Sequence, residues 1–303
     1  MKNILITGGS GLVGKRITAH LETKGYTVAW LSRSPDKYEQ KSFFWDLDSM
    51  KIDENAITWA DAIIHLAGEG VADSRWTAKR KQAILHSRTH STQILVDAIS
   101  KAEKKPQSFV AASAVGFYGF DTGDTMITEN SPSGDDFLSQ VVTAWENESQ
   151  RMESLGLRTV MLRIGIVLDK AGGALKEMMN PPVAAPLGSG EQWMSWIQIE
   201  DLARMFVFAV ESEAMSGVFN AVGPQPATNK TVTESAAKKI DKMFVNIGVP
   251  RFLLKIVLGE MAQMVLGGNK VSSKKIEAEG FKFRYPTLEE ALEKTFSKGG
   301  SRD

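Results

Sequence analysis

Three spaced glycines directly after a short apolar strand place the strongest constraint on this chain. Residues 2–14 read KNILITGGSGLVG, and an amphipathic pattern typical of a helix follows. Such a turn lets the backbone approach a pyrophosphate without a Cβ in the way, and it directs the positive end of the helix dipole at the phosphates. A purely structural turn is the alternative. The strand before and the helix after favour a nucleotide-binding turn, in which Gly8 or Gly9, Gly11 and Gly14 fill these roles.

The composition is that of a globular protein with no net charge. The 303 residues are 43% hydrophobic and 24% charged, which suits one large domain or a large and a small one. Lysine and arginine total 36, and aspartate and glutamate also total 36, so no strong field attracts nucleic acid or an anionic membrane. We therefore expect a partner of neither kind.

The cysteine count and the first residues bear on the compartment. The chain has no cysteine, which excludes disulfides, thiolate metal sites and a cysteine nucleophile, and which fits a reducing cytoplasm. The apolar run before the glycines is too short for a signal peptide, and no run approaches membrane-spanning length. Together these observations predict a cytoplasmic protein.

Apolar strands alternate with helical patterns after the glycine turn. Further strands are expected at 26–31, 42–45, 62–66, 108–112 and 159–162, and helices at 12–24, 77–103 and 134–154. Near-continuous apolar strands separated by helices are typical of a parallel sheet covered on both faces. The predicted fold class is α/β, a doubly wound parallel sheet of the Rossmann type with a smaller C-terminal α/β lobe.

Glycines and prolines break this alternation beyond residue 165. We therefore divide the chain into a Rossmann domain at 1–165 and a substrate lobe at 166–297, which includes a C-terminal domain with two helical patterns from about residue 249. Thr287 and Glu290 form a capping box for a last helix through Phe296. Residues 298–303 are expected to form a frayed tail.

The end of the second strand selects the type of dinucleotide. This position meets the adenine ribose, where an acidic side chain would accept from the 2′-hydroxyl and repel a 2′-phosphate. Here it carries Ser32 and Arg33, which suit a phosphate dianion and so predict NADP(H) rather than NAD(H). The alternative for Arg33 is a solvated surface residue. Asp46, after the third strand, is placed to accept from an adenine amine, or it is a turn residue.

Several further motifs match a known group of proteins. They are residues 7–14, the sequence HLAG at 65–68, Ser113 before the sequence FYG at 117–119, and Arg163 after the sixth strand. Together they resemble the extended short-chain dehydrogenase/reductase superfamily, of the NAD-dependent epimerase/dehydratase type. Its atypical subgroup, the epimerase family proteins, is resembled at Gly68-Glu69, Arg75-Trp76, Ser87-Arg88, 113–119 and Trp145-Glu146. The C-terminal region is similar to the uncharacterised domain that ends those proteins, so the resemblance covers nearly the whole chain.

The resemblance implies a dinucleotide site assembled from several strand ends. It assigns the pyrophosphate to the glycines, the adenosine phosphate to Ser32 and Arg33, and the ribose side to Leu66 and Ala67. Small residues after a buried strand also let a ligand lie against the backbone, although they end many strands that bind nothing. Arg88 is a further polar contact, and Arg163 either reaches the cofactor or satisfies buried carbonyl groups. The cofactor-binding residues expected in all are Thr7, Gly8, Ser10, Gly11, Leu12, Val13, Gly14, Ser32, Arg33, Asp46, Leu66, Ala67, Gly68, Arg88 and Arg163.

The catalytic pattern of that superfamily is missing from this sequence. Active members use a Tyr followed four residues later by a Lys, which lowers the pKa of the phenol. The helix expected to carry the pair reads DFLSQVVTAWE at 136–146, with neither residue at a plausible register. Ser113 is retained, either to hydrogen-bond a substrate oxygen or to close its strand as a turn residue. Tyr118 is the nearest phenol, and it either replaces the missing acid–base group or packs under a loop.

Histidines and tryptophans of the chain also have structural alternatives. Three histidines lack the spacing of metal ligands, so no metal site is expected and core or surface roles are favoured for His65, His86 and His90. A segment with two tryptophans lies where relatives border the substrate pocket, and with two methionines it could form an apolar pocket. Such side chains are more often core. The four residues are Met178, Met179, Trp193 and Trp196.

Two functions stay open at this point. The first is an NADP(H)-dependent oxidoreductase or epimerase-like enzyme that acts on an unidentified small carbonyl or hydroxyl compound with a replaced proton donor. The second is a catalytically inactive protein that binds or senses NADP(H). Retention of Ser113 and of a substrate lobe favours the enzyme slightly. The oligomeric state is open, with a homodimer as the common arrangement among relatives.

Overall fold

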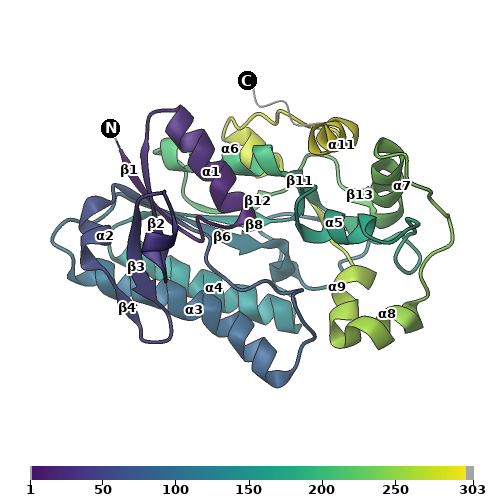
Figure 1. Cartoon of the computed structure of the whole chain (residues 1–303), viewed down its shortest axis with the longest axis horizontal. Coiled ribbons are helices and arrows are strands. Elements are labelled where there is room, and N and C mark those ends of the chain that lie inside the picture. The colour runs from purple at the N-terminus through teal and green to yellow at the C-terminus, as the bar shows by residue number, and fades with distance from the viewer. Residues whose placement is uncertain (1, 298–303) are drawn as a thin grey trace. The chain divides into compact units, whose positions relative to one another are not determined.

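The structure is a computed structural model that describes residues 2–297, so the predicted frayed tail at 298–303 lies outside the described residues (Figure 1). The chain divides into two compact units, each built from several segments. The first contains Met1–Phe117, Phe137–Arg163 and Ala203–Phe219. The second contains Tyr118–Asp136, Ile164–Leu202 and Asn220–Asp303. The single boundary near residue 165 stays a prediction.

An eight-stranded sheet forms the frame of the fold, in the order β12-β8-β6-β5-β1-β2-β3-β4. Strand β1 pairs in parallel with β2 and β5, and the β2–β3 and β5–β6 pairs are also parallel, whereas β4 is antiparallel to β3. The predicted doubly wound α/β fold is confirmed. The strands are β1 Asn3–Thr7, β2 Thr27–Ser32, β3 Ser42–Asp46, β4 Lys51–Ile52, β5 Ala62–His65, β6 Ser108–Ala114, β8 Arg158–Ile164 and β12 Gly217–Ala221.

Helices cover both faces of this sheet. Figure 1 shows α3 and α4 side by side on one face and α1 on the other. Helix α4 begins at Phe137 and not at 134, because the Asp136 carboxylate accepts from the Phe120 backbone N–H (2.7 Å) and so serves the preceding loop. Among residues 2–297, we find no helix with the length and apolar character needed to cross a membrane. The helices here are α1 Leu12–Thr23, α2 Glu54–Trp59, α3 Ala78–Lys101, α4 Phe137–Ser154 and α6 Ile199–Glu211.

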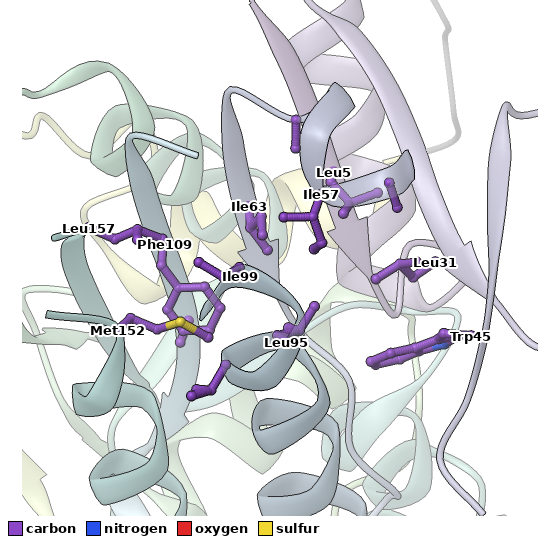
Figure 2. Close-up of a cluster of buried hydrophobic side chains, with 14 of the residues drawn as sticks. Leu5, Leu31, Trp45, Ile57, Ile63, Leu95, Ile99, Phe109, Met152 and Leu157 are labelled. Atoms are coloured by element: carbon purple, nitrogen blue, oxygen red, sulfur yellow. The ribbon is translucent and has the colours of Figure 1, made fainter. Parts of the chain in front are cut away.

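The core under α3 and α4 follows from the alternation of side chains along each strand. Leu5 of β1 faces this core, whereas Ile4 and Ile6 face the opposite side. Figure 2 shows Leu5 and Ile63 from the sheet beside Leu95 from α3. The strands of this sheet are packed on both faces, and their ends carry the candidate site.

The second unit combines short strand pairs with helices. Its core contains Trp196 and Met179, so these two side chains have the core role that the sequence favoured over a pocket role. The capping box of Thr287 and Glu290 at the start of α11 is confirmed. The two helical patterns expected after residue 249 appear as three short helices, α8 Arg251–Leu258, α9 Ala262–Leu266 and α10 Lys274–Ala278. Its other elements are β7 Met126–Ile127, β9 Ile166–Leu168, α5 Gly173–Met179, β10 Trp193–Met194, β11 Trp196–Gln198, β13 Ala227–Thr228, α7 Asn229–Lys239, β14 Lys270–Val271 and α11 Leu288–Phe296.

Candidate functional site

The glycine turn joins β1 to α1 with the geometry that the sequence predicts. Gly8 has φ +68°, a left-handed value that favours glycine, and a Cβ there would lie 3.2 Å from the Leu66 carbonyl group. A Cβ on Gly14 would collide with the Gly8 carbonyl oxygen. The N-cap of α1 is Gly11, so no side chain caps the first-turn N–H groups. These donors therefore suit an anionic ligand.

A buried polar network fixes the ends of β1 and β5 together. The Thr7 hydroxyl oxygen accepts from the backbone N–H groups of Leu66 and Ala67, each at 3.0 Å. Its own proton therefore goes to Nδ1 of His65, 2.8 Å away, which leaves the proton of the neutral ring on Nε2, facing Thr92 at 3.1 Å. Complete burial lowers the pKa of His65 to about 3. Of the core and surface roles expected from the sequence, His65 has the core role.

Basic and hydroxyl groups follow β2. Ser32 is partly buried and its hydroxyl accepts from the Ser34 N–H at 3.0 Å, while Arg33 is exposed. Asp46 accepts from the Ser49 hydroxyl at 2.5 Å, a bond that lowers the pKa of the Asp46 carboxyl, with smaller contributions from backbone N–H groups and the charge of Arg33. This geometry gives Asp46 the turn role that the sequence left open, although the residue also borders the cavity described next.

A cavity of about 990 Å³ connects the glycine turn with the end of β2. It lies within the first unit. Seven of the predicted cofactor residues line it, namely Gly8, Ser10, Ser32, Arg33, Asp46, Ala67 and Gly68. Within the described part of the chain, the others lie outside this lining, namely Thr7, Gly11, Leu12, Val13, Gly14, Leu66, Arg88 and Arg163. The volume and polar walls suit a ligand of dinucleotide class.

Sequence reasoning missed one wall of this cavity. His86 and His90 line it from α3, with their rings stacked at a centroid distance of 4.5 Å. Lys37 and Tyr38 line it after β2. The spacing of four residues between the histidines places them on one helix face and was the available signal, but spacing alone does not reveal which face borders a cavity.

Arg88 lies on α3 beside Gly68, because a Cβ on that glycine would be 3.2 Å from the Arg88 Cζ. Its guanidinium donates to the Ile84 carbonyl at 3.1 Å and lies 5.2 Å from the centre of the Trp145 ring. Burial lowers the pKa of Arg88 to about 10, and the charge of Glu69 opposes that shift. The side chain is therefore a cation held close to the Gly68 loop.

A second polar group lies at the ends of β6 and β8, and we call Ser113, Phe117, Glu146 and Arg163 the Ser113 cluster. Ser113 donates to Glu146 Oε1 at 2.5 Å. Arg163 donates to both Glu146 oxygens, from Nε and Nη2, each at 2.8 Å. The same guanidinium lies 3.4 Å from the centre of the Phe117 ring. Arg163 therefore forms an ion pair with Glu146. No role for Glu146 was expected from the sequence.

Tyr118 is oriented by a partner of its own. Its hydroxyl donates to Asn220 Oδ1 at 2.7 Å, and the side chain is only 4% exposed. Asn220 in turn donates to the Ser272 carbonyl at 3.2 Å. These contacts favour the packing alternative for Tyr118, whose catalytic role stays a prediction.

Comparison with known proteins gives two family matches that together span most of the chain. The model of the NAD dependent epimerase/dehydratase family matches residues 4–223. A domain of unknown function, DUF1731, matches residues 249–295. The epimerase family protein YfhF of Bacillus subtilis is 37% identical over 295 residues, which cover 96% of this chain and 96% of that protein.

Two solved structures of proteins described as epimerases are also similar to this chain. The crystal structure of human epimerase family protein SDR39U1 (isoform 2) with NADPH has a TM-score of 0.87 and 31% identity, and it covers 98% of this chain and 99% of its own. A nucleoside-diphosphate sugar epimerase from Corynebacterium glutamicum has a TM-score of 0.77 and 30% identity, over 96% of this chain and 57% of that one. This chain thus shares its overall fold with these two proteins.

Proposed function

The chain belongs to the NAD dependent epimerase/dehydratase family, and from this premise we propose that it is an NADP(H)-dependent oxidoreductase or epimerase-like enzyme for a small carbonyl or hydroxyl compound. The observation that carries the proposal is the single cavity that joins the glycine turn to the basic end of β2. When bound, the dinucleotide supplies hydride-transfer chemistry. The residues of this chain bind it, orient it and handle the accompanying proton.

The residues present fit the phosphates of such a cofactor. The uncapped first turn of α1 and the Gly8 backbone would hold the diphosphate, because a Cβ would obstruct the close approach. Ser32 and Arg33, with Lys37 on the same cavity wall, would hold a 2′-phosphate. Support for NADP(H) over NAD(H) comes from this charge and from the NADPH of the human relative.

A thermal-shift titration with NADP, NADPH, NAD and NADH tests the cofactor. A ligand that binds only the folded state raises stability once its concentration exceeds Kd. We expect NADP(H) to give the larger shift, and Arg33→Ala to weaken NADP(H) roughly 10–100-fold with little effect on NAD(H). Arg251→Ala, an exposed arginine of the second unit, is the matched control and should behave as wild type. Equal shifts with all four ligands would remove the NADP(H) preference.

The catalytic part of the proposal assigns Ser113 a contact with a substrate oxygen. Helix α4 contains neither Tyr nor Lys, so the usual phenol and ammonium groups are absent from it. A catalytically inactive NADP(H)-binding or sensing protein is the alternative. A panel of small alcohols and carbonyl compounds, followed by cofactor absorbance, separates the two: cofactor binding without turnover across the panel supports the second.

We extend the proposal to the setting of the protein. The absence of cysteine and of net charge supports a cytoplasmic protein whose partner is a small molecule. A homodimer is proposed from its frequency among relatives. Light scattering of the purified protein at several concentrations measures the assembly directly, and a mass equal to one chain at all concentrations would exclude the dimer.

A further inference from the structure

The Ser113 cluster contains a buried ion pair, Glu146 and Arg163, and few protein interiors contain such a pair. Ser113 is 3% exposed, Glu146 8% and Arg163 4%. Removing two such charges from water costs several kcal/mol per ion, and the attraction between them rarely exceeds that cost by much. Apolar residues of similar size would therefore stabilise the fold equally well. Packing alone therefore gives a weak reason for the pair, and its contact with Ser113 gives a specific one.

The hydrogen bonds fix which way the Ser113 proton points. A carboxylate only accepts, so the 2.5 Å bond between Ser113 and Glu146 has the serine as donor. Arg163 occupies both oxygens of Glu146 from the other side and lies against Phe117, which holds the carboxylate in place. With its one proton committed, Ser113 Oγ has only lone pairs to offer to a ligand.

We propose that Ser113 and Glu146 form a proton relay in which Ser113 accepts the proton of a ligand hydroxyl while its own proton passes to Glu146, with Arg163 as a positioning residue. The ligand O–H bond breaks and an O–H bond forms at Ser113 Oγ. The former Ser113 O–H bond breaks as an O–H bond forms at Glu146 Oε1. The ligand oxygen keeps the electron pair, Glu146 becomes neutral, and the reverse transfer returns the proton. This relay rests on the proposed function and supplies the proton step for which α4 offers no Tyr or Lys.

The first test uses the lack of cysteine, because Ser113→Cys introduces the only thiol of the chain. Its ionisation is followed by thiolate absorbance, with the wild-type protein as the blank, and needs neither ligand nor reagent access. A nearby carboxylate raises a thiol pKa from its ordinary value of about 8.5. We expect the midpoint to fall by at least about one pH unit when Glu146→Gln is added. The same midpoint in both variants would overturn the relay.

Glu148→Gln is the matched control for this titration. Glu148 lies on the same helix and pairs with Arg151 at 2.6 Å, on the surface. Added to Ser113→Cys, this substitution should leave the thiol midpoint unchanged. A shift equal to that of Glu146→Gln would show a general charge effect and contradict a direct Ser113–Glu146 bond.

The second test measures turnover on the alcohol panel and separates positioning from packing. Glu146→Gln should lower kcat by about 10²-fold or more with little change in the KM for NADP, and Ser113→Ala added to it should cause little further loss. Glu146→Asp should restore part of the rate with an altered pH profile. A Glu146→Gln rate within threefold of wild type would overturn the relay.

The two proposals fail in different ways. If wild type shows no thermal shift with NADPH, the proposed function fails, yet the thiol titration still reports whether Glu146 holds the Ser113 proton. If Glu146→Gln binds NADPH as wild type does but neither the thiol midpoint nor the rate changes, the relay fails alone. A folded Glu146→Gln variant is confirmed by its unfolding transition, and Glu146→Asp serves where that variant does not fold.

Discussion

Arg33 and Arg163 belong to the same unit, but their surroundings are opposite. Arg33 is exposed beside the cavity and makes no ion pair within the described residues, and its neighbours Ser34 and Lys37 are exposed as well. Arg163 is buried and donates to both carboxylate oxygens of Glu146. An open cation can accept an anion from solution, whereas a neutralised one can only orient its partner. The cavity therefore presents an exposed cation, whereas the Ser113 cluster neutralises its own cation with Glu146.

The largest expected effect on stability comes from breaking the buried Arg163–Glu146 pair. Arg163→Met leaves the Glu146 carboxylate buried without its cation, so we expect a loss of about 3–5 kcal/mol in the free energy of unfolding. Urea unfolding measures it. A loss below about 1 kcal/mol would mean that Glu146 is not held as a buried anion.

A pH titration adds a second buried group to the comparison, because complete burial keeps His65 neutral. The pKa of His65 is about 3 in the folded chain and 6.5 at its ordinary value. Below pH 6.5 the imidazole is therefore protonated in the unfolded chain but stays neutral in the folded chain. Stability therefore falls as the pH falls from about 6.5 toward 3. Between pH 6.5 and 5, this difference in His65 protonation should lower the free energy of unfolding by about 2 kcal/mol. We expect His65→Gln to lose that part of the slope in urea unfolding, and an unchanged slope would argue against a buried neutral imidazole.

A substitution at Gly8 tests the cavity. Gly8→Ala forces a left-handed residue and should cost about 1–2 kcal/mol in unfolding experiments. Gly8 lines the cavity, and its Cβ would lie 3.2 Å from the Leu66 carbonyl group, so NADPH affinity should fall by tenfold or more. Gly25→Ala is the control, because its φ of +83° is similar and a Cβ there meets nothing within 4 Å. Equal NADPH affinity in the two variants would show that the glycine turn does not contact the cofactor.

The smallest effect is expected from an ion pair at the surface. Arg151→Met removes the partner of Glu148 in a solvated pair, which should cost less than about 1 kcal/mol. Measured beside Arg163→Met by the same urea unfolding, it isolates the contribution of burial. Similar losses in both variants would contradict the contrast between buried and exposed guanidinium groups.

The sequence predicted the parts of the site whose cause is local. Gly8, Gly11 and Gly14 sit within seven residues, and the strand before them and helix after them follow from short-range patterns. The capping box at Thr287 and Glu290 is local in the same way. For such features the backbone conformation of a few adjacent residues decides the structure, and a sequence displays those residues directly.

The missed features depend on contacts between distant residues. Glu146 is 33 positions from Ser113 and 17 from Arg163, so no spacing pattern announces their bonds. Strand β12 joins the sheet beside β8, although its sequence GVFNA is short and contains Gly and Asn. The cavity faces of His86 and His90 likewise depend on how α3 is rotated against the sheet. These outcomes are set by tertiary packing and not by local propensity.

A crystal structure of the protein with NADPH tests the central claim most directly. The account predicts the diphosphate at the N-terminus of α1 beside Gly8, and the 2′-phosphate within hydrogen-bond distance of Ser32 or Arg33. A dinucleotide bound away from the glycine turn, or a 2′-phosphate that contacts neither of those two residues, would contradict it.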